Sequence, residues 1–73
     1  MSKKSKREQR IRENTKSVSL EDFEWLINQY GYIKAGGSHP KARIGNMTTT
    51  YKKINPVNSH YVEQILEMID NLK

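Results

Sequence analysis

Apolar residues recur at helical spacing in two separate stretches of this chain. In the first, over residues 20–30, they fall at intervals of three and four positions and form one stripe. Ser19 and Asp22 have the spacing of a capping box, and acidic side chains fill the first turns. Gly31 is expected to end this helix in a left-handed conformation. Trp25 lies off the stripe, either as a boundary residue or as a docking point for a partner.

The second helical stretch lies at the end of the sequence. Asn58 and Ser59 are both suitable N-caps, and an apolar stripe follows from Val62 to Leu72, with Met68 beside it. We therefore expect a final helix that begins near residue 58.

Three short segments between these helices have the composition and alternation of strands. Residues 32–35 are the first, and residues 38–44 alternate weakly between apolar side chains and cationic or histidine side chains. Residues 48–54 are rich in β-branched and aromatic side chains and form the third. Gly36-Gly37 and Gly45-Asn46 separate the segments as turns.

The order of these elements predicts an α+β fold, with one helix, three antiparallel strands and a second helix. The simplest packing places both helices on one face of the sheet and leaves the other face to solvent or to a ligand. In the third strand, the pattern leaves open whether Tyr51 or Ile54 faces the core. Pro56 follows and closes this strand. A chain of 73 residues is long enough for one domain of this kind.

Residues 1–16 differ in composition from residues 17–73, and we treat them as an N-terminal arm that precedes the folded domain. Ile11 is the only apolar residue inside the arm. Low hydrophobicity and high charge favour disorder. The run of helix-forming residues from Lys4 to Glu13 is instead compatible with a short extra helix, especially on a partner or on RNA. Composition leaves both alternatives open.

The net charge of +5 is unevenly distributed along the chain. Seven basic and two acidic side chains give residues 1–16 a net charge of +5, whereas the six basic and six acidic side chains of residues 17–73 cancel. In the second part, the acidic side chains lie on the two helices, and five of the six basic ones lie between Lys34 and Lys53. This separation predicts a basic sheet surface suited to a polyanion or, in the alternative, ordinary charge for solubility.

Several classes of protein are disfavoured by what the sequence lacks. It contains no cysteine, and its two histidines have no ligand-spaced companions, so neither disulfides nor a metal site is expected. No apolar run is long enough to span a bilayer or to act as a secretory signal, and the cytoplasm is the expected location. No glycine-rich phosphate loop is present, and no cofactor is expected.

His39 is the first candidate for catalysis. It follows two glycines that allow a phosphate backbone to approach closely, and on a strand it shares a face with Lys41 and Arg43. A neutral imidazole accepts a proton from a ribose 2′-hydroxyl, and neighbouring cations stabilise the pentacoordinate phosphate that forms. The alternative is a surface histidine without a catalytic role.

Two further positions are compatible with contact to a nucleic acid. Lys52 and Lys53 follow Tyr51, an arrangement that suits base stacking and phosphate contacts but equally suits an unliganded sheet rim. Only one of the two lysines is expected to share a face with His39. His60 lies at the start of the last helix, either as a second acid–base group or as a plain helix-start residue.

Taken together, several segments of this chain resemble the HicA toxins. The resemblance rests on residues 18–23, on Gly31-Tyr32, on the tripeptide Gly37-Ser38-His39 with the basic hairpin after it, and on residues 61–66 of the final helix. It covers roughly residues 15–72. Members of that family are small proteins with a double-stranded-RNA-binding-like fold, and they act as mRNA interferases that a HicB antitoxin neutralises.

The resemblance implies the toxin of a type II toxin–antitoxin system, a metal-independent endoribonuclease with mRNA as substrate and a HicB-like antitoxin as protein partner. It assigns the catalytic role to His39. The chain departs from the family pattern at Pro40, which removes a ladder hydrogen bond and so places His39 at a strand edge or bulge. The rival hypotheses are a non-catalytic nucleic-acid-binding module with the same fold and a small adaptor for another protein. The candidate RNA contacts are Gly37, Ser38, Lys41, Arg43, Lys52 and Lys53.

Overall fold

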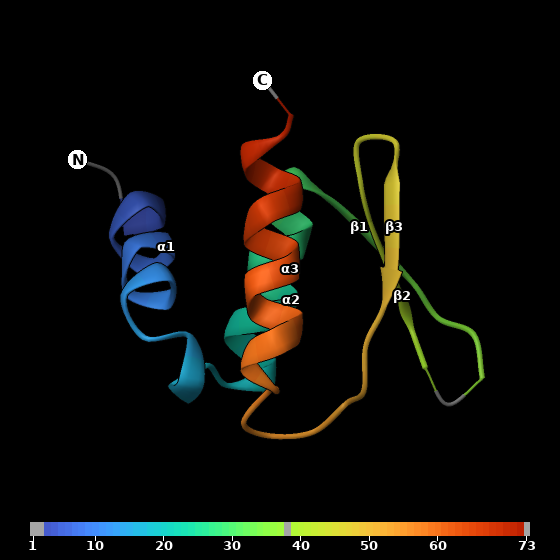
Figure 1. The fold of residues 1–73 in the computed structure, drawn as a ribbon, viewed down its shortest axis with the longest axis horizontal. Coiled ribbons are helices and arrows are strands. Elements are labelled where there is room, and N and C mark those ends of the chain that lie inside the picture. The colour runs from blue at the N-terminus through green and yellow to red at the C-terminus, as the bar shows by residue number, and fades with distance from the viewer. Residues whose placement is uncertain (1–2, 38, 73) are drawn as a thin grey trace.

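The computed structural model describes residues 3–37 and 39–72, and it has helices on one side of a small antiparallel sheet (Figure 1). This arrangement confirms the predicted α+β order, including the short extra N-terminal helix. No helix within the described residues is both long and apolar enough to cross a bilayer. The elements are α1 (Lys3–Glu13), the 3-10 turn η1 (Thr15–Ser17), α2 (Leu20–Tyr30), β1 (Gly31–Lys34), β2 (Lys41–Ile44), β3 (Met47–Thr50) and α3 (Ser59–Asp70).

The sheet has β2 at its centre, with β1 and β3 as antiparallel neighbours. Exposed and buried residues alternate along β2, and the buried ones are Ala42 and Ile44. Ile33 lies opposite Ala42 in β1, and Thr49 lies opposite it in β3. Since side chains of one face recur every second residue, this register sets one apolar face against the helices and leaves one polar face open.

The main part of the core lies between the sheet and the pair of helices α2 and α3, which cover one face of the sheet, and Ile11 of α1 joins it from the other side of these helices (Figure 1). Phe23 of α2 and Tyr51 meet edge to face at 4.9 Å between ring centroids. The described core residues are Ile11, Val18, Phe23, Leu26, Ile27, Ala42, Ile44, Tyr51, Val57, Val62, Ile65, Leu66, Met68 and Ile69.

Both helix starts that the sequence predicts are capped as expected. The Ser19 hydroxyl accepts a hydrogen bond from the Asp22 backbone N–H at 3.1 Å, and the Asn58 side chain accepts one from the His60 N–H at 2.9 Å. Each bond satisfies a backbone donor that the helix itself leaves unpaired. The stripe of α3 ends earlier than predicted, because the helix stops at Asp70 and Leu72, which lies beyond it, is 42% exposed.

Gly31 ends α2, but not through the left-handed conformation expected from the sequence. Its φ of −164° is extended, and the residue is also the first of β1. A Cβ at this position would lie 1.8 Å from the carbonyl oxygen of Arg43 in β2. The glycine is therefore required by the close approach of two strand backbones, immediately where the helix becomes a strand.

The third strand is shorter than predicted, and the structure decides which of its aromatic and apolar residues is buried. Tyr51 is fully buried, whereas Ile54 is exposed. The strand stops at Thr50 because the next position lies opposite Pro40. The Tyr51 N–H donates to the Pro40 carbonyl at 3.2 Å, but proline has no N–H with which to return the bond.

The N-terminal arm is a helix that docks on the side of α2 and α3 away from the sheet (Figure 1). Ile11 is buried in the core at 3% exposure. Charged contacts surround it: Arg7 binds Asp22 of α2 at 2.7 Å, and Arg12 binds Asp70 of α3 at 2.9 Å. Composition leaves open whether the arm is disordered or a short helix, and the structure shows a helix over Lys3–Glu13.

Trp25 is a boundary residue rather than a free docking point. It is partly buried against the core, and the guanidinium of Arg7 lies over its ring at 4.5 Å. A second aromatic contact joins the same two helices, because the Tyr30 hydroxyl donates to Glu8. That hydrogen bond is the main reason why the pKa of Tyr30 is raised. Helix α1 thus covers both aromatic side chains that α2 presents on this side.

Replacing Ile11 tests whether α1 is part of the folded unit. We expect Ile11→Ala to lower the free energy of unfolding by about 2–4 kcal/mol, because it removes a buried side chain and leaves a cavity. Urea denaturation followed by circular dichroism measures the change. The exposed Lys6→Ala variant on the same helix serves as the control and is expected to stay within about 0.5 kcal/mol of wild type. Equal stability of the two variants would contradict the docking of α1.

Alanine at Gly31 tests the close approach of β1 and β2. The added Cβ has to displace backbone, so we expect Gly31→Ala to lower the free energy of unfolding by about 3 kcal/mol or more. Gly36→Ala is the matched control, because a Cβ there meets no atom within 4 Å. It is expected to change stability by about 0.5 kcal/mol or less. Thermal unfolding of the two variants side by side distinguishes a steric requirement from a general sensitivity to glycine replacement.

Candidate nucleic-acid interface

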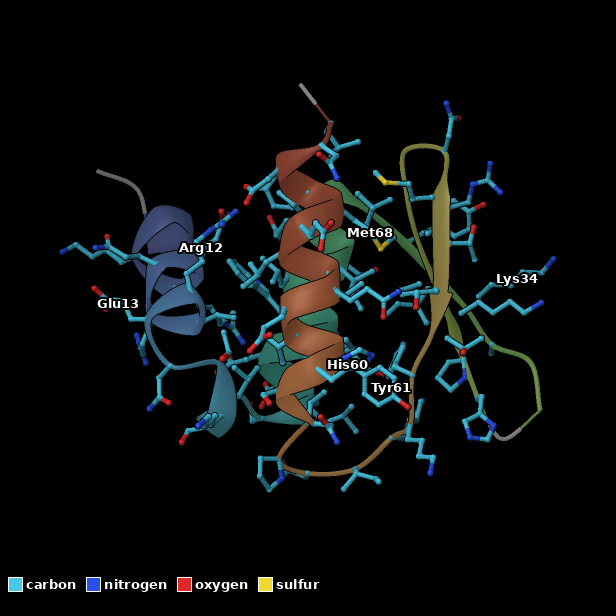
Figure 2. All side chains as sticks on the ribbon, in the orientation of Figure 1. Arg12, Glu13, Lys34, His60, Tyr61 and Met68 are labelled. Carbon is cyan, nitrogen blue, oxygen red and sulfur yellow. The ribbon has the colours of Figure 1, made fainter. Side chains whose placement is uncertain are left out.

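The open face of the sheet carries a shallow basic hollow. Its volume is about 270 Å³, and its lining comes from all three strands. Figure 2 shows Lys34 on the side of the sheet that faces away from α3. The lining residues are Tyr32, Lys34, Lys41, Arg43 and Thr48.

Strand register arranges these side chains in two rows across the sheet. Tyr32, Arg43 and Thr48 form the first row, since Tyr32 pairs with Arg43 and Arg43 with Thr48. Lys34 and Lys41 lie opposite each other in the second row. Strands are about 4.8 Å apart, and rows two residues apart on one face are separated by roughly 6.6 Å. The hollow therefore offers an aromatic ring and three cations within the reach of a few nucleotides.

The cations of this hollow form no ion pair with the part of the chain that the structure describes. Among the described residues, Lys34, Lys41 and Arg43 have no carboxylate within 4.0 Å. Lys34 and Lys41 are moreover like charges in directly opposed positions, which costs stability in an antiparallel pair. This arrangement differs from the helix side of the molecule, where α1 brings arginines to the carboxylates of α2 and α3.

His39 lies two residues before Lys41, at the end of the ladder rather than inside it. It is exposed, Pro40 is buried and Lys41 is exposed, so the alternation of β2 extends back to His39. The lining of the hollow does not include His39. Gly37 has a φ of +60°, which turns the chain just before this point. Ser38, the remaining residue of the tripeptide, lies outside the described residues.

Pro40 has the structural role of a strand end, as expected from its missing N–H. Its carbonyl still accepts a hydrogen bond from the Tyr51 N–H, so one hydrogen bond between β2 and β3 forms beyond Lys41. His39 is thus directly adjacent to a backbone position, Pro40, that a hydrogen bond holds in place. The regular one-to-one register of β2 and β3 places no bulge next to it.

Tyr51 and the two lysines after it do not join the basic hollow. Tyr51 is buried, and its hydroxyl donates to Glu24 at 2.6 Å. Burial, with this hydrogen bond, raises the pKa of Tyr51 well above its usual value. Lys53 lies 3.8 Å from the same carboxylate. Lys52 is exposed on the segment after β3. Base stacking on Tyr51, one of the alternatives from the sequence, is therefore excluded.

His60 belongs to the helix layer, on the opposite side of the sheet from the hollow. Figure 2 shows it at the lower end of α3, next to Tyr61, and the two ring centroids are 5.8 Å apart. Its backbone N–H completes the helix cap. In residues 3–37 and 39–72, no three His, Cys, Asp or Glu side chains are grouped as metal ligands.

Tyr32, Lys34 and Thr48 line this face but are not among the candidate RNA contacts from the sequence, and Tyr32 is the aromatic residue of the three. It is 54% exposed, the highest value among the large hydrophobic side chains of the described residues. Its neighbour Ile33 packs against the core, so the strand itself directs Tyr32 outward. The sequence does contain a signal for this position, because Tyr32 and Lys34 flank the apolar Ile33 in a short strand and therefore share the opposite face.

No protein-family model, curated protein or solved structure matches this chain.

Removing one of the opposed lysines tests the electrostatic description of the hollow. We expect Lys34→Gln to raise the free energy of unfolding by about 0.2–1 kcal/mol at low salt, because a directly opposed like charge is lost. The gain is expected to shrink at about 1 M salt, where charges are screened over a few ångströms. Urea titrations at both salt concentrations measure it. Lys52→Gln, outside the ladder, is the control, and a gain that is independent of salt would contradict the electrostatic cause.

Proposed function

We propose that this protein is an endoribonuclease of the HicA type that binds mRNA across the open face of its sheet and cleaves it with His39. The observation that carries the proposal is the set of three cations on this face that no carboxylate of the described residues neutralises, on a sheet whose central strand β2 begins two residues after His39. A protein that leaves like charges opposed at a cost in stability is expected to bind a polyanion there. The double-stranded-RNA-binding-like fold that the resemblance implies has the order helix, three strands, helix, which is also the order from α2 to α3 in this chain.

The chemistry needs few groups. In neutral form, the His39 imidazole takes the proton of a ribose 2′-hydroxyl, and the 2′-oxygen attacks the adjacent phosphorus. The bond from phosphorus to the 5′-oxygen then breaks, that oxygen takes up a proton from water, and the His39 imidazolium returns its proton to solvent. Lys41, two residues along the strand, is the nearest cation in sequence to stabilise the charge that develops on the phosphate oxygens. The products are a 2′,3′-cyclic phosphate and a 5′-hydroxyl end.

A second candidate function is binding of RNA without cleavage. It is favoured by the position of His39 outside the lining of the hollow. Under this alternative, the basic face remains the RNA-binding surface, and affinity falls steeply with salt. The logarithm of the binding constant decreases with the logarithm of the salt concentration, with a slope of about 0.7 for each phosphate contact to a single strand. Incubation with RNA then yields no cleavage products.

The resemblance also extends the proposal to a partner and a location. A HicA-type toxin acts on mRNA in the cytoplasm and is neutralised by a HicB-like antitoxin. A gene for such an antitoxin beside the gene for this chain would support the assignment.

Substitution of His39 tests catalysis directly. We expect His39→Ala to abolish growth arrest after induction in a bacterial host and to leave mRNA intact, because the general base is lost. General acid–base groups typically contribute 10²–10⁴-fold, so a purified His39→Ala protein is expected to lose at least about a hundredfold in cleavage rate. Northern analysis and a labelled RNA substrate measure the two effects.

His60→Ala is the matched control, since it removes the other histidine from an exposed helix start on the far side of the sheet. It is expected to cleave at the wild-type rate. Growth arrest by both His39→Ala and wild type, or by neither, would contradict the catalytic assignment. Loss of cleavage with wild-type RNA affinity supports it.

A further inference from the structure

Tyr32 differs from every other aromatic side chain of the described residues. Phe23 and Tyr51 are buried, Trp25 lies under Arg7, and Tyr30 donates to Glu8. Tyr61 packs against the core. The side chain of Tyr32 has no hydrogen bond, ring contact or ion pair within the described part of the chain, and the residue is 54% exposed. Its ring is therefore not explained by the stability of the fold.

The surroundings of Tyr32 are those of a site for a charged ligand with flat rings. Arg43 pairs with it directly across the strands, and Lys34 lies two residues along β1 on the same face. All three residues line the same hollow. An aromatic face that binds a base, next to cations that bind phosphates, is the arrangement by which proteins hold single-stranded nucleic acids.

We propose that Tyr32 is a base-stacking platform that makes the open face of the sheet selective for single-stranded RNA over duplex RNA. This inference rests on the proposed RNA-binding function. In a single strand, a base is free to leave its neighbours and lie on the Tyr32 ring while its phosphates meet Lys34, Lys41 and Arg43. In a duplex, the faces of the bases are occupied by their neighbours, and only backbone, groove edges and 2′-hydroxyls are available.

The same geometry explains why the hollow contains a ring rather than a fourth cation. Cations alone bind phosphates of either form and do not discriminate between them. Stacking contributes affinity only where a base face is accessible, and it tolerates all four bases because each has a π-face. Tyr32 thus supplies selectivity for unpaired RNA without selectivity for sequence.

Binding of a non-cleavable probe tests the proposal with the full-length protein. The probe is a labelled 2′-O-methyl RNA of about 12 nucleotides without self-complementarity, free or annealed to its complement. Its blocked 2′-oxygens prevent cleavage, so wild type and variants are compared by fluorescence anisotropy. We expect Tyr32→Ala to raise the Kd for the single strand on the order of tenfold and to change the Kd for the duplex by less than about twofold.

Two variants control for the ring and for the site. Tyr32→Phe keeps the π-face and is expected to bind the single strand within about twofold of wild type. Ile54→Ala removes another exposed apolar side chain, 53% exposed and outside the lining of the hollow, and is expected to bind as wild type does. The thermal midpoint of each variant is measured first, and since the Tyr32 side chain is largely exposed, it is expected to match wild type.

The outcomes separate this inference from the proposed function. An equal loss of affinity for single strand and duplex in Tyr32→Ala would overturn stacking, as would no loss in either form while Lys41→Gln still weakens binding. In both cases RNA binding by the basic face stands. Failure of the wild-type protein to bind either form overturns the stacking platform and the proposed function together.

Discussion

The fold depends on the alternation of side chains along the central strand β2. Ala42 and Ile44 pack inward against α2 and α3, and this packing fixes the register of both neighbouring strands. A slip of one residue would turn the apolar pair to solvent and bury two cations, at a cost far above the stability of a small domain. Strand β2 therefore contributes Ala42 and Ile44 to the core and, by the same alternation, places Lys41 and Arg43 on the open face.

A second consequence concerns charge. Helix α1 occupies the side of α2 and α3 that the sheet does not cover, and its arginines engage carboxylates on both helices. The Asp70 carboxylate is the main cause of the raised pKa of the Arg12 guanidinium. Two of the six acidic side chains of residues 17–73, Asp22 and Asp70, are thus paired on that side of the molecule. The cations of the open face remain available, even though the charges of residues 17–73 sum to zero.

Local patterns predicted the helices, their caps and the order of the elements, because each is specified by residues a few positions apart. Non-local contacts were not predictable in this way. Ile11 gave no signal of burial from inside a polar arm, since its partners are far along the chain. Gly31 was correctly placed at the end of a helix, but the reason lies in the Arg43 carbonyl of another strand.

The site was predictable to a similar extent. The cluster of basic residues in the strands indicated a polyanion surface, and Lys41 and Arg43 do line its hollow. The faces that two tyrosines take in the sheet were not predicted from the local pattern. Tyr32 and Tyr51 both occupy strand-like contexts, yet one is exposed and the other buried. Which face each takes depends on its register against β2, since Tyr32 pairs with the exposed Arg43, whereas Tyr51 lies opposite the buried Pro40.

Pro40 therefore links the fold to the proposed chemistry. Opposite Tyr51, it cannot return the ladder hydrogen bond, so β2 and β3 part at this point. Tyr51 then stays in the core through Phe23 and Glu24, whereas His39 continues outward from a backbone held by the last bond of the ladder. At the end of the ladder, His39 is exposed beside the turn at Gly37, where a phosphate backbone has room to approach.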